Sequence, residues 1–190
     1  MRYEWLVLAA LASPAMSASA TEPVSMYGIV IGQPLTIARC VLNEVPVAGP
    51  CWARAHENIA KFSPPGMQSL TVQFPVLGRP RISKFDELFV KTIDDVVEEV
   101  TLYTKGIDVA DAALRQLVEN FGQPTDQQFE SVQNRFGAQY DYIRAEWRRT
   151  GVTVVFEGVS GDLDSGVIYA TSEKARSQYR AQANSGEPKL

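Results

Sequence analysis

The chain is poor in the residues on which most catalytic and metal sites depend. It has one histidine, His56, and two cysteines, Cys40 and Cys51, among 190 residues. A lone histidine in a polar segment is typical of a surface residue, and a Ser–His–Asp hydrolase would need all its base chemistry from it. The cysteines form no C-x-x-C pair, and their spacing does not fit a metal site. We therefore expect no enzymatic activity, no metal and no cofactor.

Positive charge and long apolar runs are also scarce. The 18 lysines and arginines are outnumbered by 22 aspartates and glutamates, which gives a net charge of −4. Nucleic-acid binding needs a basic face, so we expect no nucleic-acid partner. The longest apolar run, Trp5–Ala12, is far shorter than the roughly 20 residues of a membrane-spanning helix. We expect no transmembrane segment in the mature chain.

The first twenty residues nevertheless have a recognisable organisation. Arg2 supplies positive charge, Trp5–Ala12 is uninterrupted apolar, and the A-x-A sequence at 18–20 offers the small residues that a signal peptidase reads. Residues 1–20 are therefore predicted to be a cleavable secretory signal peptide. The mature protein would start at Thr21 and be periplasmic or secreted. No cysteine follows the apolar run, which argues against a lipoprotein anchor.

Export bears directly on the two cysteines. In an oxidising compartment a pair such as Cys40 and Cys51 usually forms a disulfide. The residues between them indicate a loop, because they include Asn43, Pro46, Gly49 and Pro50. Closing this short loop is expected to stabilise the fold by about 3 kcal/mol on the chain-entropy estimate. A redox or nucleophilic thiol is the alternative, which the lack of a C-x-x-C motif disfavours.

Alternating apolar and polar residues predict strands in the first half of the mature chain. Strands are expected at Leu88–Thr92 and Val97–Thr104, with Asp94-Asp95 as the turn between them. One face of the second strand carries Val100, Leu102 and Thr104, and the other carries Glu99, Thr101 and Tyr103. A helix over Phe85–Val100 is the alternative, which the many β-branched residues disfavour.

Other segments before residue 80 give less regular patterns. Ser69–Phe74 alternates and is predicted to be a strand. Tyr27–Ile31 reads as a buried strand or an extended entry segment, and Pro34–Val41 fits either a helix or a strand. Residues 43–69 carry most of the loop signals, including Pro64-Pro65-Gly66.

The clearest helix is predicted over Val109–Phe121. Asp108 is expected to be its N-cap, Gly122 its terminating residue, and Pro124 prevents its continuation. One apolar stripe runs along the helix, made of Val109, Ala113, Leu114, Leu117, Val118 and Phe121.

After the helix, a loop over Thr125–Gln139 is expected to lead into an antiparallel meander. Its strands would lie near 143–148, 152–157 and 167–171, with turns at Thr150-Gly151 and Gly161–Gly166. Each strand has one apolar and one polar face, so the helix would cover one side of the sheet. Residues 172–190 are expected to be a polar C-terminal tail, with a short terminal helix as an alternative.

The predicted fold is α+β, with a helix packed on one face of a small antiparallel sheet over residues 21–171. Two such units in tandem, 27–104 and 108–171, are an alternative. The sequence of residues 70–74 is similar to that of 152–156, and 100–104 is similar to 167–171. The order is the same in both halves, but the intervals differ.

The second half resembles a known type of repeat unit. A helix ending in Phe121-Gly122-Gln123-Pro124 is followed by Trp147, by Val152–Phe156 and by Gly166-Val167. Over residues 108–171 this pattern resembles β-lactamase-inhibitor-type proteins and SmpA/OmlA-like outer-membrane assembly proteins. The resemblance implies helices on one face of a small antiparallel sheet and a non-enzymatic habit of binding proteins. The chain departs from SmpA/OmlA-like lipoproteins in lacking a lipid-accepting cysteine, and no inhibitory loop carries over.

These observations favour an exported protein-binding module of the cell envelope or secreted space, with another envelope or secreted protein as its partner. Its contact surface is predicted on the sheet face away from the helix, with Arg144, Arg148, Thr153, Val155 and Tyr103 as candidate binding residues.

Two alternatives come from other classes. One is an envelope hydrolase that uses a carboxylate pair such as Asp94 with Glu98. The other is a structural accessory subunit of a secretion or assembly machine. Carboxylates that converge in a deep cleft would favour the enzyme, whereas a shallow sheet face with exposed aromatic residues would favour binding.

Overall fold

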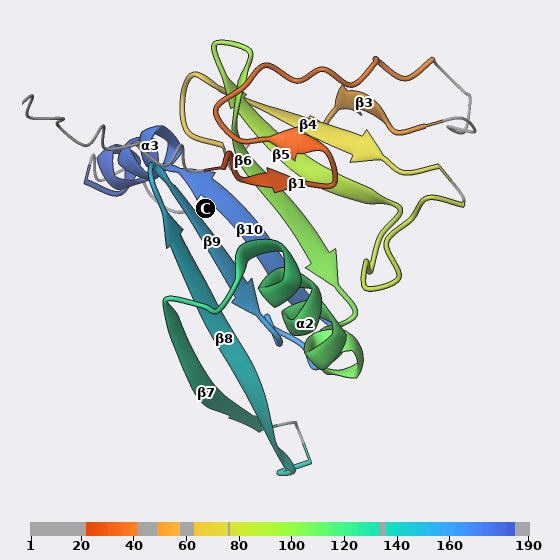
Figure 1. The fold of residues 1–190 in the computed structure, drawn as a ribbon, viewed down its shortest axis with the longest axis vertical. Helices are drawn as coiled ribbons and strands as arrows, with labels where there is room; N and C mark the ends of the chain where they lie inside the picture. Colours follow the sequence, from red (N-terminus) through yellow and green to blue (C-terminus); the bar gives the residue numbers. More distant parts are fainter. Residues whose placement is uncertain (1–21, 42–48, 58–62, 76, 134–135, 185–190) are drawn as a thin grey trace, which may run out of the picture.

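The computed structural model describes residues 22–41, 49–57, 63–75, 77–133 and 136–184 (Figure 1). The predicted signal peptide lies outside these residues, as does most of the predicted loop between the two cysteines. No helix in the described part of the chain has the length and apolar character needed to cross a membrane.

Eight strands form one antiparallel sheet with the order β3-β4-β5-β6-β10-β9-β8-β7 (Figure 1). The strands are β3 Cys51–Arg54, β4 Met67–Gln73, β5 Glu87–Ile93, β6 Val96–Thr104, β7 Asp126–Gln133, β8 Gln139–Arg149, β9 Val152–Glu157 and β10 Gly166–Ser172. A separate two-stranded sheet contains β1 Ser25–Met26 and β2 Ile29–Val30. The helical elements are η1 Gly106–Val109, α2 Ala110–Phe121 and α3 Glu173–Asn184. This arrangement confirms the predicted α+β class.

The strands predicted from alternation are present. β5 and β6 form a hairpin around Asp94 and Asp95, whose φ angles of 53° and 62° suit a tight turn that matches the twist of the strands. The alternative helix over Phe85–Val100 is wrong, because branched side chains there pair across the sheet, as Val90 does with Val100.

Each half of the described chain contributes a four-stranded meander followed by a helix. β3–β6 precede α2, β7–β10 precede α3, and β6 pairs with β10 at the centre of the sheet. The similar segments 100–104 and 167–171 lie in these two central strands. Segments 70–74 and 152–156 fall in β4 and β9, which do not hold corresponding places in the strand order. An internal repeat stays a prediction.

One side of the main sheet, called here the inner face, forms the hydrophobic core. Trp147 and Phe156 are fully buried there, in the same cluster as Ala113 and Leu117 of α2. The Trp147 indole N–H donates a hydrogen bond of 2.8 Å to the Gly122 carbonyl, so the largest core side chain also satisfies a helix terminus. The predicted alternation of Trp147 and Arg148 is therefore correct.

Helix α2 ends where the sequence predicts but begins differently. Gly122 has φ 71° and donates its N–H to the Val118 carbonyl at 2.8 Å, which closes the last turn. Asp108 is not the N-cap. It lies inside η1, and the N-cap position is Val109, which makes no side-chain capping bond.

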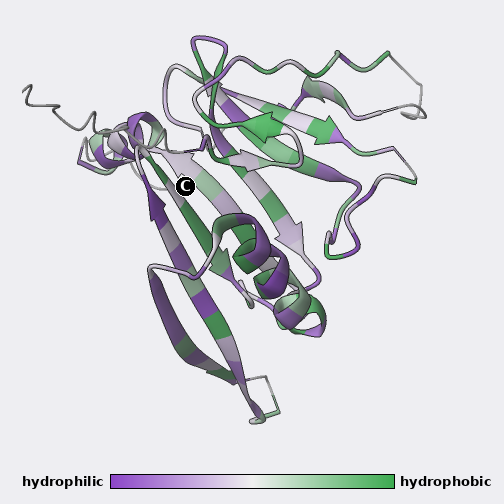
Figure 2. Ribbon diagram, viewed as in Figure 1, coloured by the Kyte–Doolittle hydropathy of each residue, from purple (hydrophilic) through white to green (hydrophobic). Residues whose placement is uncertain are grey.

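The loop predicted over Thr125–Gln139 is wrong, because most of this segment is strand. β7 and the start of β8 form a long hairpin that projects from the body of the molecule (Figure 1). Figure 2 shows β7 as mainly hydrophilic. An edge strand that buries neither side needs no apolar alternation, so the pattern used to find strands was absent there.

The segment after Ser172 is a helix over its described part rather than a fraying tail. The Ser172 hydroxyl accepts the Ala175 N–H at 3.0 Å and so caps α3. Ala175 is fully buried against Met67 and Ile93. The alternative of a short terminal helix is therefore confirmed.

The N-terminal segment forms a hairpin instead of a continuous strand. Tyr27 and Gly28, with φ angles of 51° and 82°, form the turn between β1 and β2. Of the predicted segment Tyr27–Ile31, only Ile29–Val30 is strand. Farther on, Pro34–Val41 is neither helix nor strand. It makes isolated bridges, including one that is parallel and joins Arg39 to Trp52.

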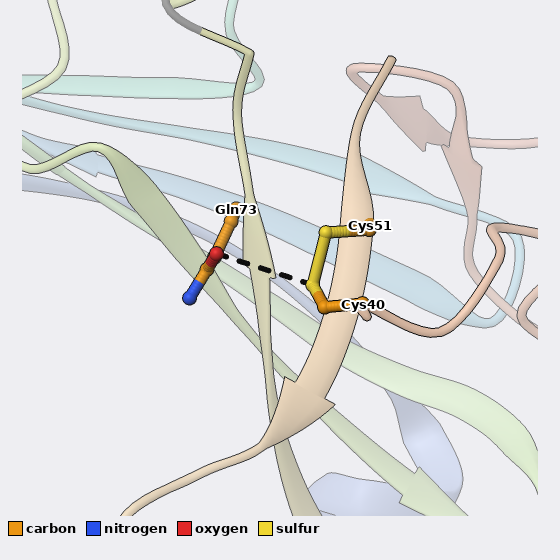
Figure 3. Close-up of a disulfide and its surroundings, with 3 residues drawn as sticks. All are labelled: Cys40, Cys51 and Gln73. Carbon is orange, nitrogen blue, oxygen red and sulfur yellow. Dashed lines mark hydrogen bonds between the residues drawn. A yellow bond between two sulfur atoms is a disulfide. The ribbon is translucent and has the colours of Figure 1, made fainter. Parts of the chain in front are cut away.

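Cys40 and Cys51 are bonded, as predicted (Figure 3). The bond fixes the segment before it beside β3, where Cys40 N donates to the Trp52 carbonyl at 2.8 Å and Trp52 N donates to the Ala38 carbonyl at 2.9 Å. Gln73 Oε1 lies 4.0 Å from Cys40 Sγ. This is a van der Waals contact, because a bonded sulfur has no proton to donate.

We expect thiol labelling of the denatured, unreduced mature protein to find no free cysteine. Reduction should lower the free energy of unfolding by about 3 kcal/mol, because the bond restricts the unfolded chain. Denaturant titrations with and without reductant measure this change. Two reactive thiols in the unreduced protein would contradict the pairing.

Candidate functional site

The side of the main sheet opposite the core cluster, called here the outer face, carries a regular grid of polar and aromatic side chains. The pairing of β6, β10, β9 and β8 places them in three rows. The first row holds Tyr103, Val167, Glu157 and Arg144; the second holds Thr101, Tyr169, Val155 and Glu146; the third holds Glu99, Thr171, Thr153 and Arg148. Residues opposite each other in antiparallel strands share a face, so all of these project to the same side.

An open groove of about 680 Å³ runs over this grid. Four of the five predicted binding residues line it, namely Tyr103, Arg144, Thr153 and Val155. They come from three different strands. The strand phase read from the sequence therefore brings them together on one surface.

Arg148, the fifth predicted residue, is on the outer face but is not part of the groove lining. Its guanidinium pairs with Glu146 at 2.6 Å, and its side chain is 64% exposed. Solvent at such a site weakens the ion pair, so Arg148 contributes little to the fold. All five predicted residues therefore lie on the outer face, and Arg148 lies beyond the groove that the other four line.

The charges along the groove are balanced. Lys91 Nζ lies 3.1 Å from Glu99 Oε1, and Arg144 Nε lies 3.4 Å from Glu157 Oε1. Both pairs link neighbouring strands across the floor. A surface of paired charges suits a polar partner of mixed charge better than a polyanion.

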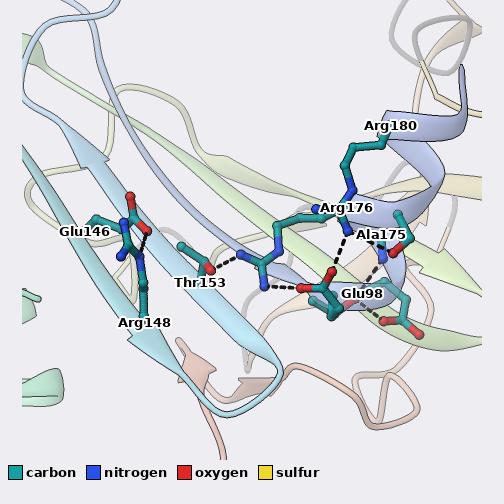
Figure 4. A network of polar contacts seen from close by, with 10 residues as sticks. Glu98, Glu146, Arg148, Thr153, Ala175, Arg176 and Arg180 are labelled. Carbon is teal, nitrogen blue, oxygen red and sulfur yellow. Dashed lines mark hydrogen bonds and ion pairs between the residues drawn. The ribbon is translucent and has the colours of Figure 1, made fainter. Parts of the chain in front are cut away.

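Helix α3 forms one wall of the groove. Figure 4 shows Arg176 reaching from α3 to the Thr153 hydroxyl, to which it donates a hydrogen bond. Lys91 Nζ donates to the Tyr179 hydroxyl at 2.6 Å and lies 5.1 Å from the centre of that ring. The helix therefore contributes a cation and an aromatic ring to a surface that the strands alone would leave flat.

Two tyrosines of the groove stay protonated at neutral pH. Burial raises the pKa of Tyr169, and the nearby Glu157 carboxylate raises it further. Burial also raises the pKa of Tyr179, helped by Glu99. Both hydroxyls remain neutral groups that can donate and accept hydrogen bonds.

An aromatic cluster adjoins the groove at Tyr103. The Tyr103 ring makes edge-to-face contacts with Phe85 and Phe89, with ring centres 5.8 and 5.6 Å apart. Phe85 is 43% exposed, so this cluster presents an aromatic ring to solvent beside the groove. Tyrosine and phenylalanine that are fixed by neighbours and partly open to solvent are typical of protein-binding surfaces.

The carboxylates proposed for a hydrolase do not converge in a cleft. Asp94 Oδ2 and Glu98 Oε1 lie 3.2 and 3.8 Å from the same Lys174 ammonium, and Glu98 also accepts a hydrogen bond from Ser172. This cluster joins the β5–β6 turn to the start of α3. Its geometry is that of a structural ion pair.

Metal and histidine chemistry find no support in the described part of the chain. It contains no group of three or more histidine, cysteine or acidic side chains placed to hold a metal ion. His56 follows β3 and is exposed. It lines neither the groove nor the cavity between the β1–β2 hairpin and α2.

A second cavity, of about 940 Å³, lies between the β1–β2 hairpin, α2 and the sheet. Val24, Leu117 and Ile168 contribute to its lining. Tyr27 accepts a hydrogen bond of 3.3 Å from Gln116 there. None of the five predicted binding residues lines this cavity.

Sequence reasoning missed much of the groove. Tyr169 and Lys91 could have been found, because they have the strand phase of residues already assigned to the outer face. Arg176 and Tyr179 could not be found in the same way, because their segment is polar and shows no apolar stripe that would orient a helix. The cap residue Ser172 and the helix-forming residues that follow it, such as Ala175 and Arg176, are the signals that indicate a helix there.

Comparison with protein-family models, curated proteins and solved structures finds no match for this chain. The resemblance to β-lactamase-inhibitor-type and SmpA/OmlA-like proteins therefore stays a prediction.

Proposed function

We propose that this protein is an exported, non-enzymatic binding module that contacts another protein of the envelope or secreted space through its outer face. In this arrangement α2 packs over the inner face, which leaves the groove side for a partner. The burial of Ala113 and Leu117 in one cluster with Trp147 supports that placement of the helix. The Cys40–Cys51 disulfide supports export, because such bonds persist in oxidising compartments.

The observation that carries the proposal is the open groove beside the aromatic cluster of Phe85, Phe89 and Tyr103. Tryptophan, tyrosine and arginine are the residues most enriched where binding energy concentrates in protein interfaces, and Tyr103 and Arg144 line the groove from its two ends. A shallow surface of this composition favours macromolecular binding over catalysis. Asp94 and Glu98, the rival catalytic pair, are instead held by Lys174.

Site-specific photo-crosslinking tests the proposal. A photoreactive phenylalanine analogue in place of Tyr103 should yield a discrete protein adduct in the compartment to which the chain is exported. The same analogue in place of Leu77, which is fully exposed in a loop, is the control. An adduct that forms equally at both positions, or at neither, would contradict the proposal.

Arg144→Ala should weaken binding of the captured partner by about tenfold or more while leaving the unfolding midpoint almost unchanged. Arg115→Ala, on the exposed side of α2, is the matched control and should have no effect on binding. Titration calorimetry with the purified partner measures both variants. Equal losses for the two would place the interface elsewhere.

A further inference from the structure

The two edges of the main sheet are treated differently. At the β3 edge, the segment before Cys40 runs alongside the strand, bonds to Trp52 and is fixed by the disulfide. At the opposite edge, β7 pairs with β8 on one side, and no described element pairs with its free edge. Half of the β7 backbone groups, at alternate residues, therefore point away from β8 with their donors and acceptors unused by the sheet.

Apart from two acidic side chains, Asp126 and Glu130, β7 lacks the features that normally prevent edge-to-edge pairing. Its eight residues, Asp126–Gln133, include no lysine and no proline. They pair with β8 in one continuous register without a bulge. Long, regular, unprotected edges are templates for another strand.

An exposed aromatic side chain lies in the middle of this edge. Phe129 is 72% exposed and sits opposite Ile143, on the side of the sheet that carries Trp147. A large apolar residue at the centre of an open strand gains little in the isolated chain. It would be buried if a second strand lay against β7.

Charge excludes some of the possible self-pairing registers. Opposed residues of antiparallel strands share a face, so two copies of β7 related by a two-fold axis place one residue opposite itself. With Gln128 on the axis, Asp126 faces Glu130, and with Glu130 on the axis, two glutamates face each other. With Phe129 on the axis, each acidic residue faces a neutral one, Val132 or Gln128. Like charges directly opposite destabilise a strand pair, which disfavours the Gln128-centred and Glu130-centred registers. Of the registers centred on Gln127, Phe129 and Ser131, which avoid this repulsion, the Phe129-centred one pairs the most residues of β7.

We infer that β7 is a self-association edge, at which two copies of this chain pair antiparallel about Phe129 into one continuous sheet. The two-fold pairing uses both open edges, so assembly stops at the dimer. Because the axis is perpendicular to the sheet, the grooves of the two copies lie on the same side.

Sedimentation velocity of the full mature protein over a concentration series tests the inference. The protein should show a concentration-dependent dimer and no larger species. Phe129→Lys should raise the dissociation constant by about tenfold or more. Leu77→Lys makes the same apolar-to-lysine change at a fully exposed position in a loop and should leave the constant unchanged. A protein that is monomeric throughout, or a dimer that is indifferent to Phe129→Lys, would overturn the inference.

Cysteine trapping tests the register independently. Phe129→Cys places the new thiol opposite its own copy and should form a covalent dimer under mild oxidation. Glu130→Cys, one residue along, faces Gln128 and should not. The native cysteines are already bonded, so only the new thiol can react. Trapping through position 130 rather than 129 would reject the Phe129-centred register.

Discussion

Gly106→Ala is expected to destabilise the protein by about 4 kcal/mol or more, one of the largest effects available from a single methyl group. Gly106 opens η1 with φ 63°, a conformation that strains an L-residue. A Cβ atom at this position would lie 2.1 Å from the Leu163 carbonyl oxygen and 2.5 Å from the Ser165 nitrogen. These are backbone atoms of the loop before β10, which Ile107 N also bonds, at 2.9 Å to Leu163 O. They cannot move aside as a flexible side chain can.

Gly151→Ala is the matched control for this prediction. Gly151 has φ 75°, and a Cβ atom there would meet nothing within 4 Å. Its substitution carries only the conformational penalty of about 1–2 kcal/mol. Denaturant unfolding of the two variants separates strain from collision. Equal losses would mean that the close approach of η1 to the Leu163 loop is absent in solution.

The central part of the fold was predictable because burial on one side of a sheet imposes an alternating pattern. The inner-face phases of β6, β8 and β9 follow from Leu102, Trp147 and Phe156, all of which are fully buried. β9 also buries its outer-face residues Thr153 and Val155, at 7% and 5% exposure. The same phases assigned Tyr103, Arg144, Thr153 and Val155 to the outer face. Arg148 has the same phase, so all five predicted contact residues lie on the outer face, and four of them line the groove.

The elements that were missed lack that pattern for identifiable physical reasons. β7 is an edge strand with no apolar alternation, and β3 is short and follows a loop-rich segment. α3 is strongly polar, because it buries little more than Ala175 and is held to the sheet by polar contacts such as the ion pair of Lys174 with Asp94 at 3.2 Å. Periodicity detects elements that face a core, so polar elements at the margin escape it.

The groove shows the same division between strands and helix. Its floor is made of strand residues whose orientation follows from alternation. Its wall depends on α3 meeting β5 through Lys91 and Tyr179, which are far apart in the sequence. No local pattern encodes that contact. A long-range pairing of this kind becomes visible only in the folded chain.

Leu117→Ala is expected to lower the free energy of unfolding by about 2–5 kcal/mol, because it removes a buried leucine and leaves a cavity. Leu117 is only 5% exposed and shares the core cluster with Trp147 and Phe156. A domain of this size has roughly 5–15 kcal/mol of stability in total, so the unfolding midpoint should fall substantially. The disulfide lies at the far edge of the sheet and should stay intact, which intact-mass measurement after thiol labelling would show.

Arg148→Ala is the companion variant, and its expected effect on stability is below about 0.5 kcal/mol. The Arg148 side chain is 64% exposed and pairs only with Glu146 among the described residues, on the opposite side of the strand from Trp147. Comparing both variants by denaturant unfolding therefore tests the phase of β8 from its two sides. A large loss for Arg148→Ala would place that side chain in a packed environment and reverse the inner and outer faces. The groove, the aromatic cluster and the proposed contact surface all depend on this phase, so the pair of measurements also tests the structural basis of the proposed function.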